Sequence, residues 1–292
     1  MELVLRQIGI ILWKDLLIDL RRKENILAMF FFSLLTLLIF QFSLGGEEDL
    51  RYRLTPRAVV DLQSTGQLEN ATLAAKTLVG RTFPTQQAFL MAVMETNPKI
   101  TGPQRIVLLQ AAKRNFLQES VPGLLWVSFL LAGVLGLSKS FGQERENGCI
   151  DGLLLTPVNR GVLYLGKMGS NALFLILLLV LLVPVFALLF QAPLDAMIWP
   201  LSPVLLGGVL GFCALGTLLG GVTSTLRGKE VLLPLLLFPL ITPILIVVVH
   251  LTSVILEGGP LADEMGWIQL LVAGDVVFLM ISYLVFDFVM EA

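Results

Sequence analysis

The chain has 292 residues, of which 56% are hydrophobic and 14% charged, and its mean hydropathy is +0.85. Soluble domains carry about 25% charged residues, so this composition excludes an ordinary soluble domain and indicates an integral membrane protein. The formal charge of −2 gives no electrostatic basis for binding nucleic acid, and two cysteines with one histidine exclude a disulfide scaffold or a four-ligand Cys/His metal site.

Residues 1–24 predict an amphipathic helix that lies flat on the inner surface of the membrane. At 100° per residue, four charged residues fall within one arc: Lys14, Asp15, Asp19 and Arg22. Four aliphatic residues line another arc: Leu5, Ile8, Leu12 and Leu16. Trp13 suits an anchor at the level of the lipid headgroups. The helix either leads into the membrane or docks a partner, and the sequence leaves both roles open.

Six stretches are apolar enough to cross a bilayer, which takes about 20 residues of helix. They run over residues 25–44, 122–140, 168–190, 201–226, 231–256 and 268–290. The first is too long for a cleaved signal peptide, and we expect it to stay as an anchor. The fold class predicted is therefore an all-α membrane protein with six transmembrane helices.

Orientation follows from the basic residues in the short connections. With the N-terminus inside, eleven Lys and Arg residues fall on the inner side, and the short outer loops at 191–200 and 257–266 contain none. By the positive-inside rule, both termini face the cytoplasm. The other nine basic residues lie within 45–121, a connection too long for the rule to govern.

Several residues inside the spans invite a structural or a functional interpretation. Two small-xxx-small pairs predict close helix packing: Gly207 with Gly211, and Gly216 with Gly220. Four prolines predict kinks that serve as moving parts or as fixed bends: Pro184, Pro234, Pro239 and Pro243. His250 is a speculative ligand contact near the outer membrane edge, but without a second candidate ligand a hydrogen-bonded role in the bundle is favoured, and no metal site is expected.

The inner connection at 141–167 has the most distinctive sequence. Asp151 can cap a short helix that ends before Pro157 and contains three leucines. Burying each leucine is worth about 1.5 to 3 kcal/mol, so this segment needs a partner surface, either the lipid interface or another protein. Its candidate residues are Glu144, Arg145, Glu146, Gly148, Asp151, Leu153, Leu154, Leu155 and Pro157.

A partial match to a phosphate-binding loop lies at the end of this connection. Gly161, Gly166 and Lys167 have the required spacing, but Met168 stands where the motif needs a Ser or Thr hydroxyl for magnesium. The lysine also leads into a membrane span, so the match is a coincidence of spacing. With no nucleophile set around the single histidine either, we expect that the protein is not an enzyme and does not hydrolyse nucleotide by itself.

Three segments resemble a known family: PGLLW at the start of the second span, ERENGCIDGLLLTPV in the inner connection, and VLLPLLLFPL at the start of the fifth span. On these segments the chain resembles the cytochrome c maturation protein B family, the membrane subunit of a haem exporter. The resemblance is loose over 1–56 and close over 117–292. It implies an ABC-2-like transmembrane subunit of the bacterial inner membrane, present in two copies per complex.

The same resemblance implies partners and cargo. The partners are a cytoplasmic ATPase that holds ATP and magnesium, a haem-handling membrane subunit, a small single-span subunit and a periplasmic haem chaperone. Haem is a possible cargo, with no cofactor bound by this chain alone, and the inner connection at 141–167 is the coupling loop that seats in the ATPase. Two other functions stay open: an ABC-2-type exporter of a lipid, peptide or polysaccharide, and a scaffold that tethers the ATPase and moves no cargo.

The outer connection at 45–121 departs from the family. Residues 58–116 form an insertion of about 60 residues with three helix-like segments, which predict a small helical module in the periplasm. So short a segment supports only a marginal core. A structural or neutral insertion is therefore favoured over a binding site for the haem chaperone or another assembly partner.

Overall fold

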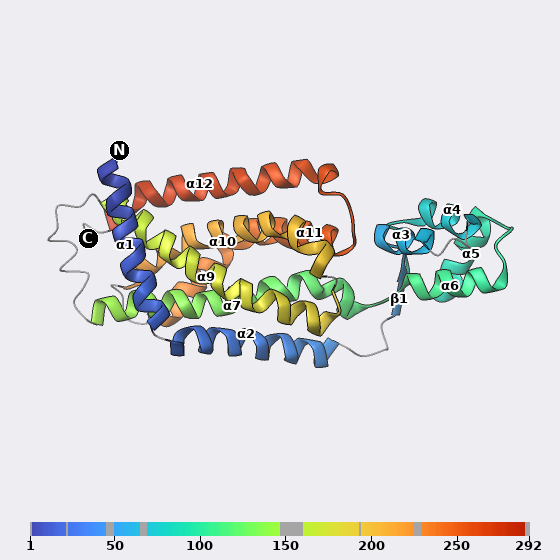
Figure 1. The fold of residues 1–292 in the computed structure, drawn as a ribbon, viewed down its shortest axis with the longest axis horizontal. Coiled ribbons are helices and arrows are strands. Elements are labelled where there is room, and N and C mark those ends of the chain that lie inside the picture. Colours follow the sequence, from blue (N-terminus) through green and yellow to red (C-terminus); the bar gives the residue numbers. More distant parts are fainter. Residues whose placement is uncertain are drawn as a thin grey trace.

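The computed structural model describes residues 2–21, 23–44, 50–64, 69–146, 160–192, 194–224 and 229–289. Most of these residues form a bundle of long helices, and a small module of short helices and strands lies at one end of it (Figure 1). We call the end of the bundle next to the module the outer end. The N-terminal helix and the C-terminal end of the last helix lie at the opposite, inner end.

Six helices of the described chain are long and apolar enough to cross a membrane. They are α2 (Lys23–Leu44), α7 (Phe116–Glu146), α9 (Arg160–Phe190), α10 (Leu194–Ser224), α11 (Lys229–Leu256) and α12 (Met265–Val289). Each contains one of the six predicted spans or most of it, so the prediction of a six-span helical membrane protein is confirmed.

The ends of two helices differ from the prediction. The inner connection was expected to run over 141–167, but α7 continues to Glu146 and α9 already begins at Arg160. The prediction took the charged Lys167 as the edge of the membrane-spanning helix. In the structure this lysine is buried against another helix, so the charge marks a packing contact and the helix extends beyond it.

The N-terminal helix α1 (Glu2–Arg21) crosses the first turns of α9 at the inner end of the bundle (Figure 1). Its residues Ile11 and Leu12 pack against the backbone of α9. Trp13, by contrast, is 62% exposed, as expected of a residue that anchors in the headgroup layer.

Helix α10 lies at the centre of the bundle and packs against α7, α9, α11 and α12. Its glycines allow large side chains to approach: a Cβ atom at Gly208 would lie 2.2 Å from Trp126 of α7. Trp126 makes an edge-on contact with Phe129, whose ring in turn contacts Phe212 of α10, with ring centroids 5.6 and 5.5 Å apart. Small residues opposite large aromatic ones give this part of the bundle a close-packed core.

The module at the outer end is mainly helical, as predicted, and also contains three short strands that the sequence did not predict. Its elements are β1 (Leu50–Arg53), α3 (Pro56–Ser64), α4 (Glu69–Leu78), β2 (Thr82–Phe83), α5 (Gln86–Thr96), α6 (Gly102–Ala112) and β3 (Lys113–Asn115). The strands form an antiparallel sheet in the order β2-β1-β3. Pairing of β1 with β3 brings the entry and exit of the module side by side.

The module has a hydrophobic core of its own. Phe89 of α5 is fully buried at its centre and contacts the rings of Tyr52 and Phe83, with ring centroids 6.0 and 5.6 Å away. Leu54, Leu78 and Leu108 are also buried there. The core is separate from that of the bundle, so the module is a small folding unit inserted between α2 and α7.

Candidate functional site

The first turns of α9 are unusually rich in small residues, and neighbouring helices use them to approach closely. A Cβ atom at Gly161 would lie 2.4 Å from the ring of Tyr283 on α12. At Gly166 and Gly169 it would lie 2.8 Å and 2.9 Å from Ile11 and Leu12 of α1. A Cβ atom at any of these positions would force its neighbour to shift, and this is hardest at Gly166, where the close atoms include the Cβ of Ile11.

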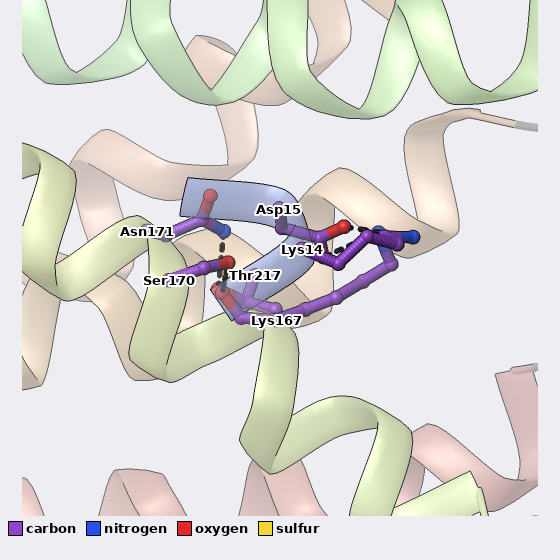
Figure 2. Close-up of polar contacts among 6 residues, drawn as sticks. All are labelled: Lys14, Asp15, Lys167, Ser170, Asn171 and Thr217. Carbon is purple, nitrogen blue, oxygen red and sulfur yellow. Dashed lines mark hydrogen bonds and ion pairs between the residues drawn. The ribbon is translucent and has the colours of Figure 1, made fainter. Parts of the chain in front are cut away.

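A buried ion pair joins α1 to the same turns of α9. The Nζ atom of Lys167 lies 3.7 Å from Oδ2 of Asp15, and the two side chains are only 6% and 8% exposed (Figure 2). The Nζ atom of Lys14 lies 2.8 Å from Oδ1 of the same carboxylate. Buried charges are costly unless they are paired, so this contact fixes how α1 is seated on α9.

This ion pair corrects the prediction for the N-terminal helix. Asp15 was placed on the polar arc of a helix lying flat on the membrane, with its charge in water. The structure turns Asp15 inward, because the glycines of α9 let α1 approach and Lys167 offers a positive charge. Leu12, assigned to the apolar arc, also contacts α9.

Two buried hydrogen bonds then connect α9 to α10. The Asn171 amide Nδ2 donates to Thr217 Oγ1 at 3.1 Å, and the Tyr164 hydroxyl donates to the carbonyl oxygen of Ala214 at 3.0 Å (Figure 2 draws the first). Phe286 of α12 packs against the Tyr164 ring, with centroids 5.2 Å apart. We call residues 160–171 of α9, with their contacts to α1, α10 and α12, the inner hub.

The predicted coupling residues flank the inner hub in sequence. Glu144, Arg145 and Glu146 form the last turn of α7, and Arg160 is the first residue of α9. The remaining predicted residues lie outside the described residues: Gly148, Asp151, Leu153, Leu154, Leu155 and Pro157. The chain therefore passes from this segment directly into the inner hub.

The partial phosphate-loop match falls inside the inner hub. The structure gives its residues other roles: Gly161 and Gly166 are contact points for α12 and α1, and Lys167 pairs with Asp15. All three lie within a continuous helix. A phosphate-binding loop requires an open loop of backbone N–H groups before its helix, which this helical segment does not provide.

The glycines singled out on α10 lie in helix contacts. Gly207 faces Leu271 of α12. A Cβ atom at Gly211 would lie 2.3 Å from Ile244 of α11 and 2.5 Å from Oδ1 of Asp275 on α12, and one at Gly216 would lie 2.4 Å from Leu137 of α7. Gly220 is buried as well. The four prolines Pro184, Pro234, Pro239 and Pro243 lie inside the continuous helices α9 and α11, and their role as moving parts stays a prediction.

His250 belongs to a small cluster at the outer end. Its Nε2 atom lies 3.1 Å from Oε2 of Glu264, in the short helix η1 (Leu261–Glu264), and its ring lies 4.4 Å from the Trp267 ring on α12. A ring nitrogen of histidine is the atom that ligates iron, and in this structure the Nε2 atom of His250 is paired with the Glu264 carboxylate instead. Within the described residues, no group of three or more His, Cys, Asp or Glu side chains is placed to hold a metal ion.

Two features of the outer half of the bundle were not predicted from the sequence. The Trp126 indole Nε1 donates to Thr252 Oγ1 at 2.9 Å, a buried bond between residues 126 positions apart. A groove of about 370 Å³, open on one side, lies between α9 and α10 and is lined by Pro184, aliphatic side chains and the hydroxyl-bearing Ser202. The opposite charges of Asp15 and Lys167 are at least compatible with an ion pair when the sequence is read alone. Nothing in the sequence relates the indole of Trp126 to the hydroxyl of Thr252.

Comparison with known proteins gives consistent matches. Residues 73–291 match the family described as CcmB protein. Heme exporter protein B of Pseudomonas aeruginosa is 32% identical over 185 residues, which cover 63% of this chain and 78% of that protein. The proteins of the same name from Rhodobacter capsulatus and Paracoccus denitrificans are 34% and 33% identical and are covered over 68% and 75% of their lengths. No solved structure matches the chain.

Proposed function

The chain belongs to the CcmB family, and from this premise we propose that it is the membrane-spanning subunit of a bacterial haem export system used in cytochrome c biogenesis. In this proposal a separate cytoplasmic ATPase hydrolyses ATP, and this chain transmits the resulting motion to the outer side, where haem is delivered or a haem chaperone is released. The fold is ABC-2-like, with two copies in the complex and both termini in the cytoplasm.

The observation that carries the proposal is the inner hub. The predicted coupling residues end at Pro157, and the turns of α9 that begin at Arg160 are joined to α1, α10 and α12 by glycine contacts, a buried ion pair and buried hydrogen bonds. Closely packed interiors move as units with discrete arrangements. A displacement of the segment by an ATPase would therefore move these helices together.

Helix α9 is also long enough to carry this displacement across the membrane. Its 31 residues span about 45 Å at 1.5 Å per residue. At its outer end the Gln41 amide Nε2 donates to the carbonyl oxygen of Leu189, which connects α9 to α2. The outer end of the bundle would thus respond to events at the inner end.

The three leucines at 153–155 supply the attachment to the ATPase. They lie in a polar connection and need a hydrophobic partner surface. A groove on the ATPase provides that surface in our proposal, and the acidic and basic residues Glu144, Arg145 and Glu146 surround the contact. The haem-handling membrane subunit, the single-span subunit and the periplasmic haem chaperone complete the proposed complex.

A second candidate is that the chain transmits motion and tethers the ATPase without conducting haem. The groove between α9 and α10 favours it, because its lining is aliphatic except for Ser202 and therefore suits lipid or another helix better than the charged edge of haem. Haem accumulation in energised vesicles separates the two functions: a haem conduit requires this chain for accumulation, and a scaffold does not. An exporter of another cargo would leave haem delivery intact when the chain is deleted.

The attachment is tested by Leu154→Asp, which places a charge in the proposed contact. We expect the ATPase to be lost from the purified complex and cytochrome c maturation to stop. Leu73→Asp is the matched control, since Leu73 is an exposed leucine of the module, and it should keep both. Retention of the ATPase together with normal maturation in the Leu154 variant would show that the docking assignment is wrong.

A further inference from the structure

One carboxyl group lies deep among the membrane-spanning helices. Asp275 is close to the middle of α12 (Met265–Val289) and of the candidate span Leu261–Phe286, which contains most of that helix. A charge is most costly at this depth of a bilayer, and ionisable residues found there are usually functional. Asp275 therefore needs either a partner of opposite charge or a bound proton.

The helices around Asp275 provide no opposite charge. Helix α12 packs against α9, α10 and α11 and against the short helix η1. In the sequence, Asp275 is the sole charged residue in the apolar parts of the four long helices, which are residues 168–190, 196–224, 231–249 and 265–286. The charged residues of η1 at the outer end, Asp263 and Glu264, are both acidic. A carboxylate at position 275 would thus have no cation beside it.

The other titratable side chains on these helices do not face Asp275 either. His250 of α11 lies nearer the outer end and already has a carboxylate partner. Tyr283 lies eight residues further along α12, about 12 Å toward the inner hub, where it contacts α9. Cys213 of α10 is two residues after Gly211, which at 100° per residue places it on the opposite side of that helix.

Asp275 packs against a part of α10 that has no side chains. A Cβ atom at Gly211 would lie 2.5 Å from Oδ1 of Asp275, and a Cβ atom at Gly207 would lie 3.4 Å from Oδ2. Leu271, one turn away on α12, covers Gly207 in the same way. We call the surface formed by Gly207 and Gly211 the glycine notch. The carboxyl group of Asp275 is thus turned into the bundle, toward the notch.

The surroundings of this carboxyl group suit its neutral form. Its Oδ1 atom is buried and has no hydrogen-bond partner in the part of the chain that the structure describes. The glycine notch and the buried side chains of Ile244 and Leu271 offer only C–H groups, which are weak donors. Burying an ionised carboxylate without a counter-charge or strong donors costs far more than burying a neutral polar group.

We propose that Asp275 is a proton-binding site and that its bound proton holds α12 in the glycine notch of α10. Release of the proton to water leaves a negative charge on the carboxyl group, and α12 has to move away from the notch until water or lipid headgroups solvate it. Helix α12 can move in this way because it lies at the edge of the bundle, and residues on its other face, such as Val276, Met280 and Leu284, are exposed (Figure 1). This inference goes beyond the proposed function, since it requires neither ATP nor haem.

The first test detects the proton by infrared spectroscopy of the full chain in nanodiscs of zwitterionic lipid. Ordinary carboxyl groups are ionised above about pH 5, so a carboxylic acid C=O band at neutral pH reports a group that keeps its proton. We expect this band in the wild type and its loss in Asp275→Asn. The control Asp263→Asn removes a carboxylate from an exposed position of η1 and should keep the band. Absence of the band at neutral pH, or an unchanged band in Asp275→Asn, would overturn the proposal.

The second test measures the position of α12. Spin labels are placed at Leu206→Cys on α10 and Met280→Cys on α12, two exposed positions, with Cys149→Ser, while the fully buried Cys213 stays unlabelled. As the pH is raised until the infrared band disappears, we expect the distance between the labels to change by about 1 to 2 Å or more. With Asp275→Asn, which has no proton to release, the distance should be the same at every pH.

The wild type alone decides the matter if Asp275→Asn does not fold. The band and the label distance must then change over the same range of pH. A constant distance while the band disappears would show that the proton does not hold α12, and a band that persists at every pH at which the protein stays folded would show that the proton is not released. Either result would overturn the proposal and leave the proposed function untouched, because neither measurement involves the ATPase or haem.

Discussion

The two ends of α9 differ in how closely they are packed. At the inner end, α1, α10 and α12 contact α9 through glycines, the Asp15–Lys167 ion pair and buried hydrogen bonds. Toward the outer end, α9 borders an apolar groove of about 370 Å³ that it shares with α10 and that is open on one side. One helix thus combines a tightly joined end with an end that has room beside it.

The difference suggests that the two ends of α9 have different roles in transmitting a motion. A groove between two helices leaves room for side chains to rearrange, so we expect the helices to be displaced more readily there than in the close-packed inner hub. A motion that starts at the inner hub would therefore move several helices together, and rearrangement would concentrate at the outer half.

Asp15→Ala should have the largest effect, because it leaves Lys167 buried without its partner. We expect the free energy of unfolding to fall by about 3 kcal/mol. Unfolding in mixed detergent micelles, followed by circular dichroism, measures it. The double variant Asp15→Leu with Lys167→Met removes both charges and should recover most of the loss, and an equal loss in both variants would show that the pair does not hold α1 on α9.

Gly166→Leu should come next, because it inserts a side chain where Ile11 already lies. Overpacking of this kind costs about 1 to 3 kcal/mol, and α1 should separate from α9. Gly9→Leu is the matched control, since nothing lies within 4 Å of a Cβ atom at Gly9. Protease sensitivity of α1 reports the separation, and identical digestion of the two variants would contradict a close contact.

Thr252→Val tests a buried bond at the outer end. It removes the acceptor of the Trp126 indole N–H, and an unsatisfied buried donor costs about 1 to 3 kcal/mol. Thr36→Val is the control, because Thr36 on an exposed face and Thr252 both donate their hydroxyl to the backbone carbonyl four residues earlier, at Phe32 and Val248. Tryptophan emission and detergent unfolding should change in the first variant alone.

Arg53→Gln should have the smallest effect on stability. The Arg53–Glu257 pair is partly exposed, and such pairs contribute about 1 kcal/mol or less. The bundle should unfold as before, while hydrogen exchange at the ends of β1 increases as the module loses one attachment. Glu257→Gln should have the same effect on hydrogen exchange. An unfolded module in either variant would show that the Arg53–Glu257 pair is needed for folding of the module and not only for its attachment to the bundle.

The spans were predictable because hydrocarbon fixes both the length and the composition of a crossing helix. The boundaries of α9 were not, since Lys167 looked like the edge of the membrane until Asp15, more than 150 residues away in sequence, was seen to pair with it. The strands of the module have four, two and three residues, too few to show an alternating pattern.

The candidate site was predictable only in part. The leucines at 153–155 stood out because apolar residues in a polar connection are unusual, and the helical glycines stood out by spacing. Which helix each glycine faces depends on the packing of the whole bundle: Gly166 and Gly169 face α1, and Gly161 faces α12. His250 attracted attention as a ligand, but its carboxylate partner Glu264 lies in the short helix η1, which the sequence did not predict.

A disulfide between α1 and α9 tests most directly whether the inner hub moves as one unit. The Cβ atom of Ile11 lies 2.9 Å from the position of a Cβ atom at Gly166, so a small separation allows the geometry of Ile11→Cys with Gly166→Cys. The variant, made with Cys149→Ser, is reconstituted with its partner subunits, and ATP-driven haem delivery is measured before and after oxidation. Our account predicts the same rate in both forms. Delivery that stops on oxidation and returns on reduction would contradict it, because α1 and α9 would then have to separate during the cycle.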